Sequence, residues 1–158
     1  MSRPRKTSRA RKRAARKTGS LAARLRAVED RDEIRELTAR YCHAVAAGDA
    51  EAIVGLFCED GVFEMNGRPV VGRAELAKFY GAVAGTPPIP FIQNHVVALN
   101  GDTATGRCSV EIRVVQNGEA YTAAGWYDDA YRQEARGWRF AQRKFHVFHW
   151  VPLAKGWA

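Results

Sequence analysis

The first half of the chain is patterned for helices. Within residues 21–47, apolar side chains recur about every 3.6 residues with charged side chains between them, which predicts a long amphipathic helix. The apolar positions are Leu25, Val28, Ile34, Leu37, Tyr41 and Val45. Gly48 suits the end of this helix, and Asp49 suits the N-cap of a short second helix over 50–57. The segment "RAELAKFYGAV" at 73–83 predicts a third helix.

The second half is patterned for strands. The stretch "GVFEMNGRPVVG" at 61–72 alternates and contains a turn, so it predicts a short hairpin before the third helix. "GTPPIP" at 85–90 predicts a loop, because proline suits neither a helix interior nor a central strand. From Phe91 onward, strands are separated by hairpin turns at Gly101–Asp102, Asn117–Gly118 and Arg136–Gly137. The expected fold is α+β, with three helices followed by a four-strand antiparallel meander.

The three turns predict which side chains of the meander share a face. Directly opposed residues in antiparallel strands point to the same side. Two-residue loops at these turns predict one row across the sheet, His95–Cys108–Tyr127–His146. The next rows on that face are Val110–Gly125–Phe148 and Ile112–Ala123–Trp150, and polar residues including Arg143 take the opposite face. We expect the apolar face to pack on the helices, with groups able to transfer protons at its centre. A slip of one residue at any turn would break the row.

The net charge is concentrated in the first 20 residues. This segment holds nine of the 25 Lys and Arg residues and none of the 17 acidic residues, so the remainder is nearly neutral. It has no aromatic residue and no apolar periodicity, which predicts a disordered basic tail on a single domain over 21–158. The tail is interpreted as a solubilising arm, as a contact for nucleic acid or another polyanion, or as a transit peptide if the source is eukaryotic.

The remaining composition narrows the class of protein. The cysteines Cys42, Cys58 and Cys108 have no paired spacing, which favours a reducing cytoplasm over a disulfide framework or a zinc site. We expect neither a secretory signal nor a membrane span, since no apolar run approaches the roughly 20 residues that a span needs. Motifs for nucleotides or metals are absent from the sequence, so no cofactor and no metal are expected. The acidic pair Asp128–Asp129 is interpreted as solvated strand charges.

Four stretches together resemble the SnoaL-like, scytalone-dehydratase-like branch of the nuclear transport factor two-like superfamily. They are "DRDEIRELTARYCHAVAAGDAEAIVGLFCEDGVFEMNG", "GRAELAKFYGAV", "IQNHVVALNGDTATGRCSV" and "GWYDDAYRQEARGWRFAQRKF", which cover about residues 21–150. The resemblance implies a cone-shaped, curved antiparallel sheet wrapped around N-terminal helices, with an internal cavity. The superfamily holds dehydratases, dehydrochlorinases, isomerases, cyclases, epoxide hydrolases and non-catalytic proteins on one scaffold.

The resemblance also implies roles for individual residues. His95, in "IQNHVV", matches the histidine that transfers a proton in dehydratases and dehydrochlorinases of this group, and Tyr41 matches a tyrosine of the bile-acid dehydratases. The aspartate that pairs with that histidine falls at Ala46, and a second carboxylate falls at Ile112. Without the acid, burial favours a neutral His95, which is a weaker base.

These residues support two hypotheses of function. The first is a cofactor-independent lyase or isomerase acting on a hydrophobic oxygenated molecule such as a polyketide, steroid or terpenoid. His95 would transfer the proton, with His146 as a substitute, while Tyr41 and Tyr127 hold the substrate oxygen. Cys108, Ile112, Phe148 and Trp150 would line the pocket. The second is a non-catalytic protein that binds a similar ligand or acts as a dimeric interaction module. We also expect a homodimer through the face that carries Phe145, Val147 and His149.

The separation of tail and domain gives a testable prediction. Deleting residues 1–20 should leave the melting temperature and any ligand binding unchanged. It should abolish salt-sensitive retention on heparin, because the remaining charge is close to zero. A truncated protein that still binds heparin with a steep salt dependence would contradict this assignment.

Overall fold

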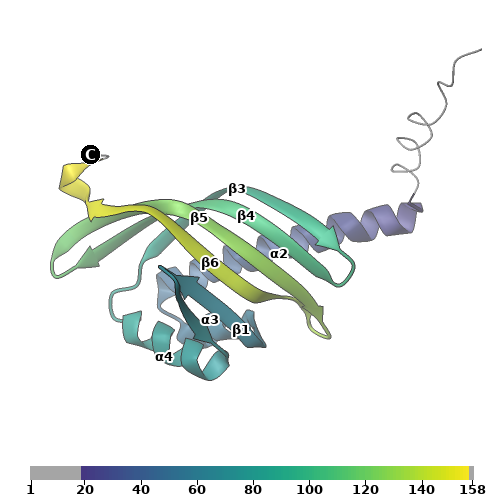
Figure 1. Cartoon of the computed structure of the whole chain (residues 1–158), viewed down its shortest axis with the longest axis horizontal. Helices are drawn as coiled ribbons and strands as arrows, with labels where there is room; N and C mark the ends of the chain where they lie inside the picture. The colour runs from purple at the N-terminus through teal and green to yellow at the C-terminus, as the bar shows by residue number, and fades with distance from the viewer. Residues whose placement is uncertain (1–18, 157–158) are drawn as a thin grey trace, which may run out of the picture.

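In the described part of the chain, three α-helices cover one side of the sheet and leave the other side open (Figure 1). The computed structural model describes residues 19–156. The helices are α2 (Leu21–Ala47), α3 (Ala50–Gly55) and α4 (Arg73–Val83), close to their predicted bounds. Gly48 is the C-cap of α2 in the left-handed conformation, and the Asp49 side chain accepts a hydrogen bond from the Ala52 amide at the start of α3. No helix in the described part of the chain is long and apolar enough to cross a bilayer.

Six strands form one curved sheet in the order β2-β1-β6-β5-β4-β3. They are β1 (Phe57–Met65), β2 (Arg68–Val71), β3 (Ile89–Asn100), β4 (Thr103–Gln116), β5 (Glu119–Glu134) and β6 (Gly137–Pro152), followed by the short helix η1 (Leu153–Lys155). The meander β3 to β6 is antiparallel, which confirms the α+β cone. The pattern did not predict that β1 pairs with β6 in parallel. Ile89 and Pro90, expected in a loop, begin β3, where an edge strand accommodates proline.

The burial of α2 differs along its length. Ile34, Leu37 and Tyr41 are buried against the sheet as predicted. Leu25 and Val28, predicted to belong to the same apolar face, are 55% and 62% exposed. The periodic pattern therefore continues beyond the part of the helix that has a sheet to pack on.

The register of the meander was predicted in part. Cys108 opposes Tyr127, Ile112 opposes Ala123, and Ala123 opposes Trp150, as expected. The row through His95 and His146 is wrong, because the sheet is irregular at three places. One register shift lies in β3, between Gln93 and Val96. The other two lie in the β5–β6 pairing, one between Ala124 and Gly125 and one between Ala130 and Tyr131. The last turn is also displaced, since Glu134 opposes Gly137.

The β5–β6 irregularities exchange side chains between the two faces of β6. Tyr127 opposes Phe145 instead of His146, and Asp129 opposes Arg143. Phe145 is buried and Val147 packs against the core, so the prediction that these two point outward with His149 is wrong. Arg143, predicted on the outer face, is completely buried on the helix side. One extra residue in a strand is enough to reverse every following side chain.

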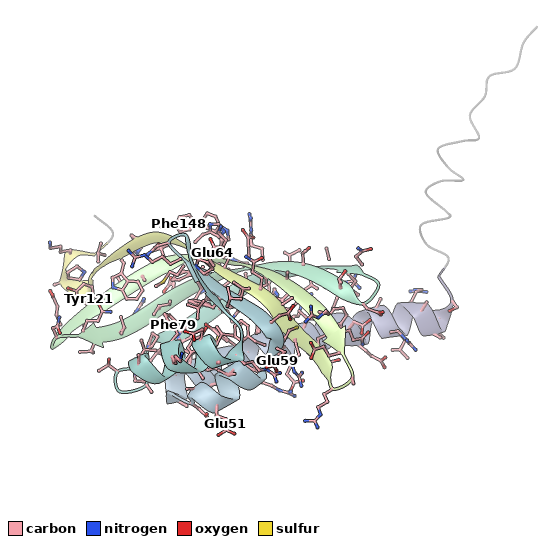
Figure 2. All side chains as sticks on the ribbon, turned by 60° about the horizontal axis from the view of Figure 1, so that its bottom comes forward. Glu51, Glu59, Glu64, Phe79, Tyr121 and Phe148 are labelled. Carbon is pink, nitrogen blue, oxygen red and sulfur yellow. The ribbon has the colours of Figure 1, made fainter. Side chains whose placement is uncertain are left out.

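The outer face of the sheet carries exposed apolar side chains. Phe148 is 67% exposed, so its predicted place in the pocket is wrong. Figure 2 shows it on the side of the sheet away from the helices, whereas Phe79 lies among them. Strands β3 and β4 also carry large exposed apolar side chains, namely Ile89, Phe91, Val96 and Val115. An uncovered apolar sheet face of this kind is typical of a protein–protein contact.

We expect a second copy of the chain to bind on this outer face. Light scattering at micromolar concentration should report a dimer, and Phe148→Asp should shift it to the monomer because a carboxylate would be desolvated in the contact. Leu25→Asp is the matched control, because Leu25 is similarly exposed but lies near the start of α2, away from the outer face of the sheet. A monomeric unsubstituted protein would contradict the expectation.

Candidate functional site

An apolar pocket of about 280 Å³ lies between the helices and the sheet. Its residues come from α2, β1, α4, the segment before β3, and strands β3 to β6. The apolar wall includes Val45, Phe63, Met65, Phe79, Ile112 and Phe145. Val83, Thr86 and Gln116 are exposed and lie at its mouth. Among the described lining residues there is no histidine and no charged side chain.

Three tyrosines form the buried end of the pocket. Tyr41 comes from α2, Tyr80 from α4 and Tyr127 from β5, and all three are at most 4% exposed. The hydroxyl oxygens of Tyr41 and Tyr80 are 2.9 Å apart and share a hydrogen bond. The Tyr41 ring meets those of Tyr80 and Tyr127 edge-on, with centroids 6.2 and 6.1 Å apart. A phenol pair of this kind leaves a second hydroxyl hydrogen to donate to a ligand oxygen.

A buried ion pair lies next to the tyrosines. Arg143 of β6 donates from Nε and Nη2 to the Asp129 carboxylate of β5, over 2.9 and 2.8 Å, and both side chains are fully buried. The guanidinium carbon lies 4.3 Å from the Tyr41 ring centroid and 4.2 Å from that of Tyr127. It also lies 4.2 Å from the Phe140 ring. The charge is therefore held by two hydrogen bonds and three aromatic faces.

A second chain of contacts leads from Asp129 to His95. The Tyr131 hydroxyl donates to Asp129 over 2.8 Å and lies 3.2 Å from His95 Nε2. Thr38 of α2 is 3.5 Å from the same hydroxyl. His95 is half-buried, and its Nδ1 is buried without a partner among the described residues. The histidine thus contacts the Tyr131 hydroxyl, and the Asp129 carboxylate contacts that hydroxyl and not the histidine.

Burial sets the protonation of these groups. It raises the pKa of Tyr41 to about 12, against the opposing influence of the Arg143 charge. Burial also raises the pKa of Tyr127 and Tyr80 well above 10, so all three phenols are hydrogen-bond donors at neutral pH. The pKa of His95 is lowered, chiefly by burial and against the attraction of Asp129, so its neutral form persists to lower pH.

The structure does not bring all the predicted site residues together. Tyr41, Tyr127, Ile112 and Trp150 line the pocket. Cys108 is fully buried in the core beside Tyr127, and burial raises its thiol pKa to about 12, so it is a neutral core side chain. His95 lies in the irregular part of β3, where it contacts the Tyr131 hydroxyl of β5 instead of opposing Cys108 of β4, and it does not line the pocket.

His146 lies on the outer face, contrary to the prediction. It stacks on Trp126 with ring centroids 4.8 Å apart, and its Nε2 is 3.1 Å from Asp128. The shifted register of β6 is the cause, and it removes His146 from any chemistry in the pocket. The interpretation of Asp128–Asp129 as two solvated charges is wrong for Asp129, and Asp128 is partly exposed but paired with Arg107 and Trp126. Asp129 is 4% exposed and in phase with the inward Tyr127 and Tyr131, a signal that the sequence contains.

Ala46, the position at which the relatives carry an aspartate, also lies far from His95. Ala46 borders a separate cleft with Thr86 and Arg113. Thr38, which contacts the Tyr131 hydroxyl, lies eight residues earlier on α2, or roughly 12 Å along the axis at about 1.5 Å per residue. An aspartate at Ala46 would therefore not reach His95. Within residues 19–156 there is no group of three His, Cys, Asp or Glu side chains able to hold a metal ion.

Comparisons with known proteins agree with this architecture. The sequence profile of the SnoaL-like domain matches residues 26–144. A steroid Delta-isomerase from Nocardioides simplex is 42% identical over 55 residues, a match that covers 34% of this chain and 45% of that protein. The match thus spans less than half of the isomerase.

Two solved structures are similar over most of their length. An NTF2-like protein with a cystatin-like fold from Novosphingobium aromaticivorans is 35% identical with a TM-score of 0.69, over 81% of this chain and 88% of that one. A variant of Rv3472, a protein of unknown function from Mycobacterium tuberculosis, is 27% identical with a TM-score of 0.72, over 82% of this chain and 76% of that one.

Neighbouring aspartates provide a test of the buried pair. Asp129→Asn should lower the free energy of unfolding by about 3–5 kcal/mol, because it leaves the Arg143 charge buried without its partner. Asp128→Asn should lower it much less, by about 1 kcal/mol or below, because its ion pair with Arg107 is partly exposed to solvent. Urea denaturation of both variants measures the difference. Equal effects would show that burial of the pair contributes little to stability.

Proposed function

This chain belongs to the family of SnoaL-like domains, and we propose that it is a cofactor-independent isomerase or lyase acting on a hydrophobic, oxygenated small molecule. The observation that carries the proposal is the Tyr41–Tyr80 phenol pair at the buried end of an apolar pocket. A hydrogen bond from a phenol polarises a carbonyl and stabilises the negative charge that grows on its oxygen when a neighbouring proton leaves. The surrounding apolar wall excludes water and strengthens that interaction.

The pocket favours a substrate with a rigid apolar body. Small-molecule sites usually span about 300–1,000 Å³, so 280 Å³ is at the lower end and encloses one or two rings at a time. The exposed mouth residues allow the rest of a larger molecule to extend outward. The steroid Delta-isomerase named among the relatives supports a polycyclic ketone as the substrate class. Polyketides and terpenoids with a carbonyl have the same chemistry.

His95 is the proposed proton-transfer group. Its imidazole is neutral because burial disfavours the charged form, so it can accept a proton. Tyr131 and Asp129 orient it from one side, in place of a direct carboxylate partner. His95 does not line the pocket, and the buried side chains of Arg143, Asp129 and Tyr131 link it to the phenols. The proposal therefore requires these side chains to move apart when the substrate binds.

One observation favours a second candidate function. None of the described lining residues is a histidine or a carboxylate, which is the composition of a binding pocket without a base. A non-catalytic protein that holds an oxygenated apolar ligand would need only the phenols and the wall. The two candidates share the ligand and differ in the role of His95.

The ligand-binding part of the proposal is tested with Tyr41→Phe. Affinity for a cyclic ketone should fall about tenfold, since a hydrogen bond contributes about 1–1.5 kcal/mol. Affinity for the matching hydrocarbon, which has no oxygen, should stay the same. Tyr121→Phe, which removes a hydroxyl outside this pocket, is the control. Calorimetry that finds equal losses for ketone and hydrocarbon would contradict a polar role for Tyr41.

The catalytic part is tested with His95→Gln and solvent deuterium exchange. NMR of a ketone ligand in D₂O detects removal of the α-proton without knowledge of the natural substrate. Exchange should fall roughly 10²- to 10⁴-fold in the variant while affinity changes little. In the unsubstituted protein, the rate should rise with pH through a pKa below 6.5 and then remain flat, because the neutral imidazole is the active form. Ketone binding without exchange in either protein would favour the non-catalytic candidate.

A further inference from the structure

The arginine behind the phenols has no role in the function proposed so far. Arg143 does not line the pocket, yet its guanidinium lies against the faces of Tyr41 and Tyr127, which do. A fully buried arginine is expensive to desolvate, and a neutral residue of similar volume usually stabilises a core as well or better. Its position therefore points to an effect on the two phenols.

Asp129 balances the charge of Arg143 but does not satisfy all of its hydrogen-bond donors. Asp129 binds Nε and Nη2, whereas Nη1 is buried without a hydrogen-bond partner among the described residues. At Tyr41 the arginine acts more strongly than Asp129 does, and at Tyr127 it opposes the effect of burial. The pair as a whole is neutral, but the two phenol rings lie directly against its positive partner and therefore experience a positive electrostatic potential from the guanidinium.

We propose that Arg143, fixed by Asp129, is a positioning residue that makes the phenol end of the pocket selective for a ligand oxygen carrying negative charge. The inference rests on the proposed function, because it needs a ligand oxygen at Tyr41. The guanidinium withdraws electron density from the faces of the rings, so their hydroxyls donate stronger hydrogen bonds. The ligand class is a weak oxygen acid, a phenol or an enol, bound as its anion. A neutral ketone gains less binding free energy from these hydrogen bonds, since its oxygen carries only a partial charge.

The first experiment uses the unsubstituted protein. Calorimetry above the pH at which 4-nitrophenol ionises compares 4-nitrophenolate with 4-nitrotoluene, a neutral molecule of similar shape. The phenolate should bind about tenfold more tightly, because its oxygen accepts a hydrogen bond from Tyr41 and lies near the positive partner of the pair. If the neutral molecule binds equally well or better, the inference is wrong and the proposed pocket stands. If neither binds, the inference and the proposed function both fail.

The second experiment removes the pair without leaving a lone buried charge. The double variant Asp129→Asn/Arg143→Met deletes both charges and retains similar volumes. It should lose about tenfold in affinity for 4-nitrophenolate and keep its affinity for 4-nitrotoluene. The visible absorbance of bound 4-nitrophenol should show its ionisation shifted to higher pH by about one pKa unit.

The control is Asp60→Asn/Arg132→Met, which removes an exposed cross-strand pair and makes the same change in composition. It should leave both affinities unchanged. Equal losses for the anion and the neutral molecule in the buried-pair variant would mean that Arg143 only supports the packing, which overturns the inference. If that variant does not fold, the unsubstituted protein still decides through the pKa of bound 4-nitrophenol, which should lie below that of the free phenol, whereas a raised pKa would overturn the inference.

Discussion

The buried pair of Arg143 and Asp129 is the interaction around which the inner face of the sheet is arranged. Removing both ions from water is costly, and the cost is offset only where geometry is favourable on every side. Here the carboxylate accepts two bonds from the arginine and one from Tyr131, while aromatic faces cover the guanidinium. These contacts join β5, β6 and α2, so the pair places Tyr41 and Tyr127 relative to one another.

The pair depends on an irregularity in the sheet. Regular alternation from the predicted turn would direct Arg143 to solvent and His146 inward. The shift between Ala130 and Tyr131 reverses that order and brings Arg143 opposite Asp129. A bulge carries no strong sequence signature, whereas a turn such as Asn117–Gly118 does. For this reason the β4–β5 register could be predicted from the sequence and the β5–β6 register could not.

The same distinction separates the site residues that could be predicted from those that could not. Tyr41 follows from the helical period, and Tyr127 follows from a register counted across one regular hairpin. Tyr80 was accessible through its spacing from Leu76, four residues earlier on α4, since both are buried. Arg143 required knowledge of the bulge. The exposed Leu25 and Val28 are the opposite case, because their period was correct but nothing lies opposite them to bury.

The resemblance implied that this chain lacks the acid that pairs with the histidine in its relatives. The geometry shows that an acid at that position would not reach His95 here. Ala46 is too far along α2 to have supplied a partner to His95, and β5 contributes a carboxylate at Asp129 instead. That carboxylate is already paired with Arg143, so what reaches His95 is the Tyr131 hydroxyl. A hydroxyl orients an imidazole without stabilising its charged form as a carboxylate would. The charged groups of the site therefore act on the phenols, which Arg143 contacts, and not directly on the histidine. Such a site is better suited to holding negative charge on a ligand oxygen than to holding positive charge on a base.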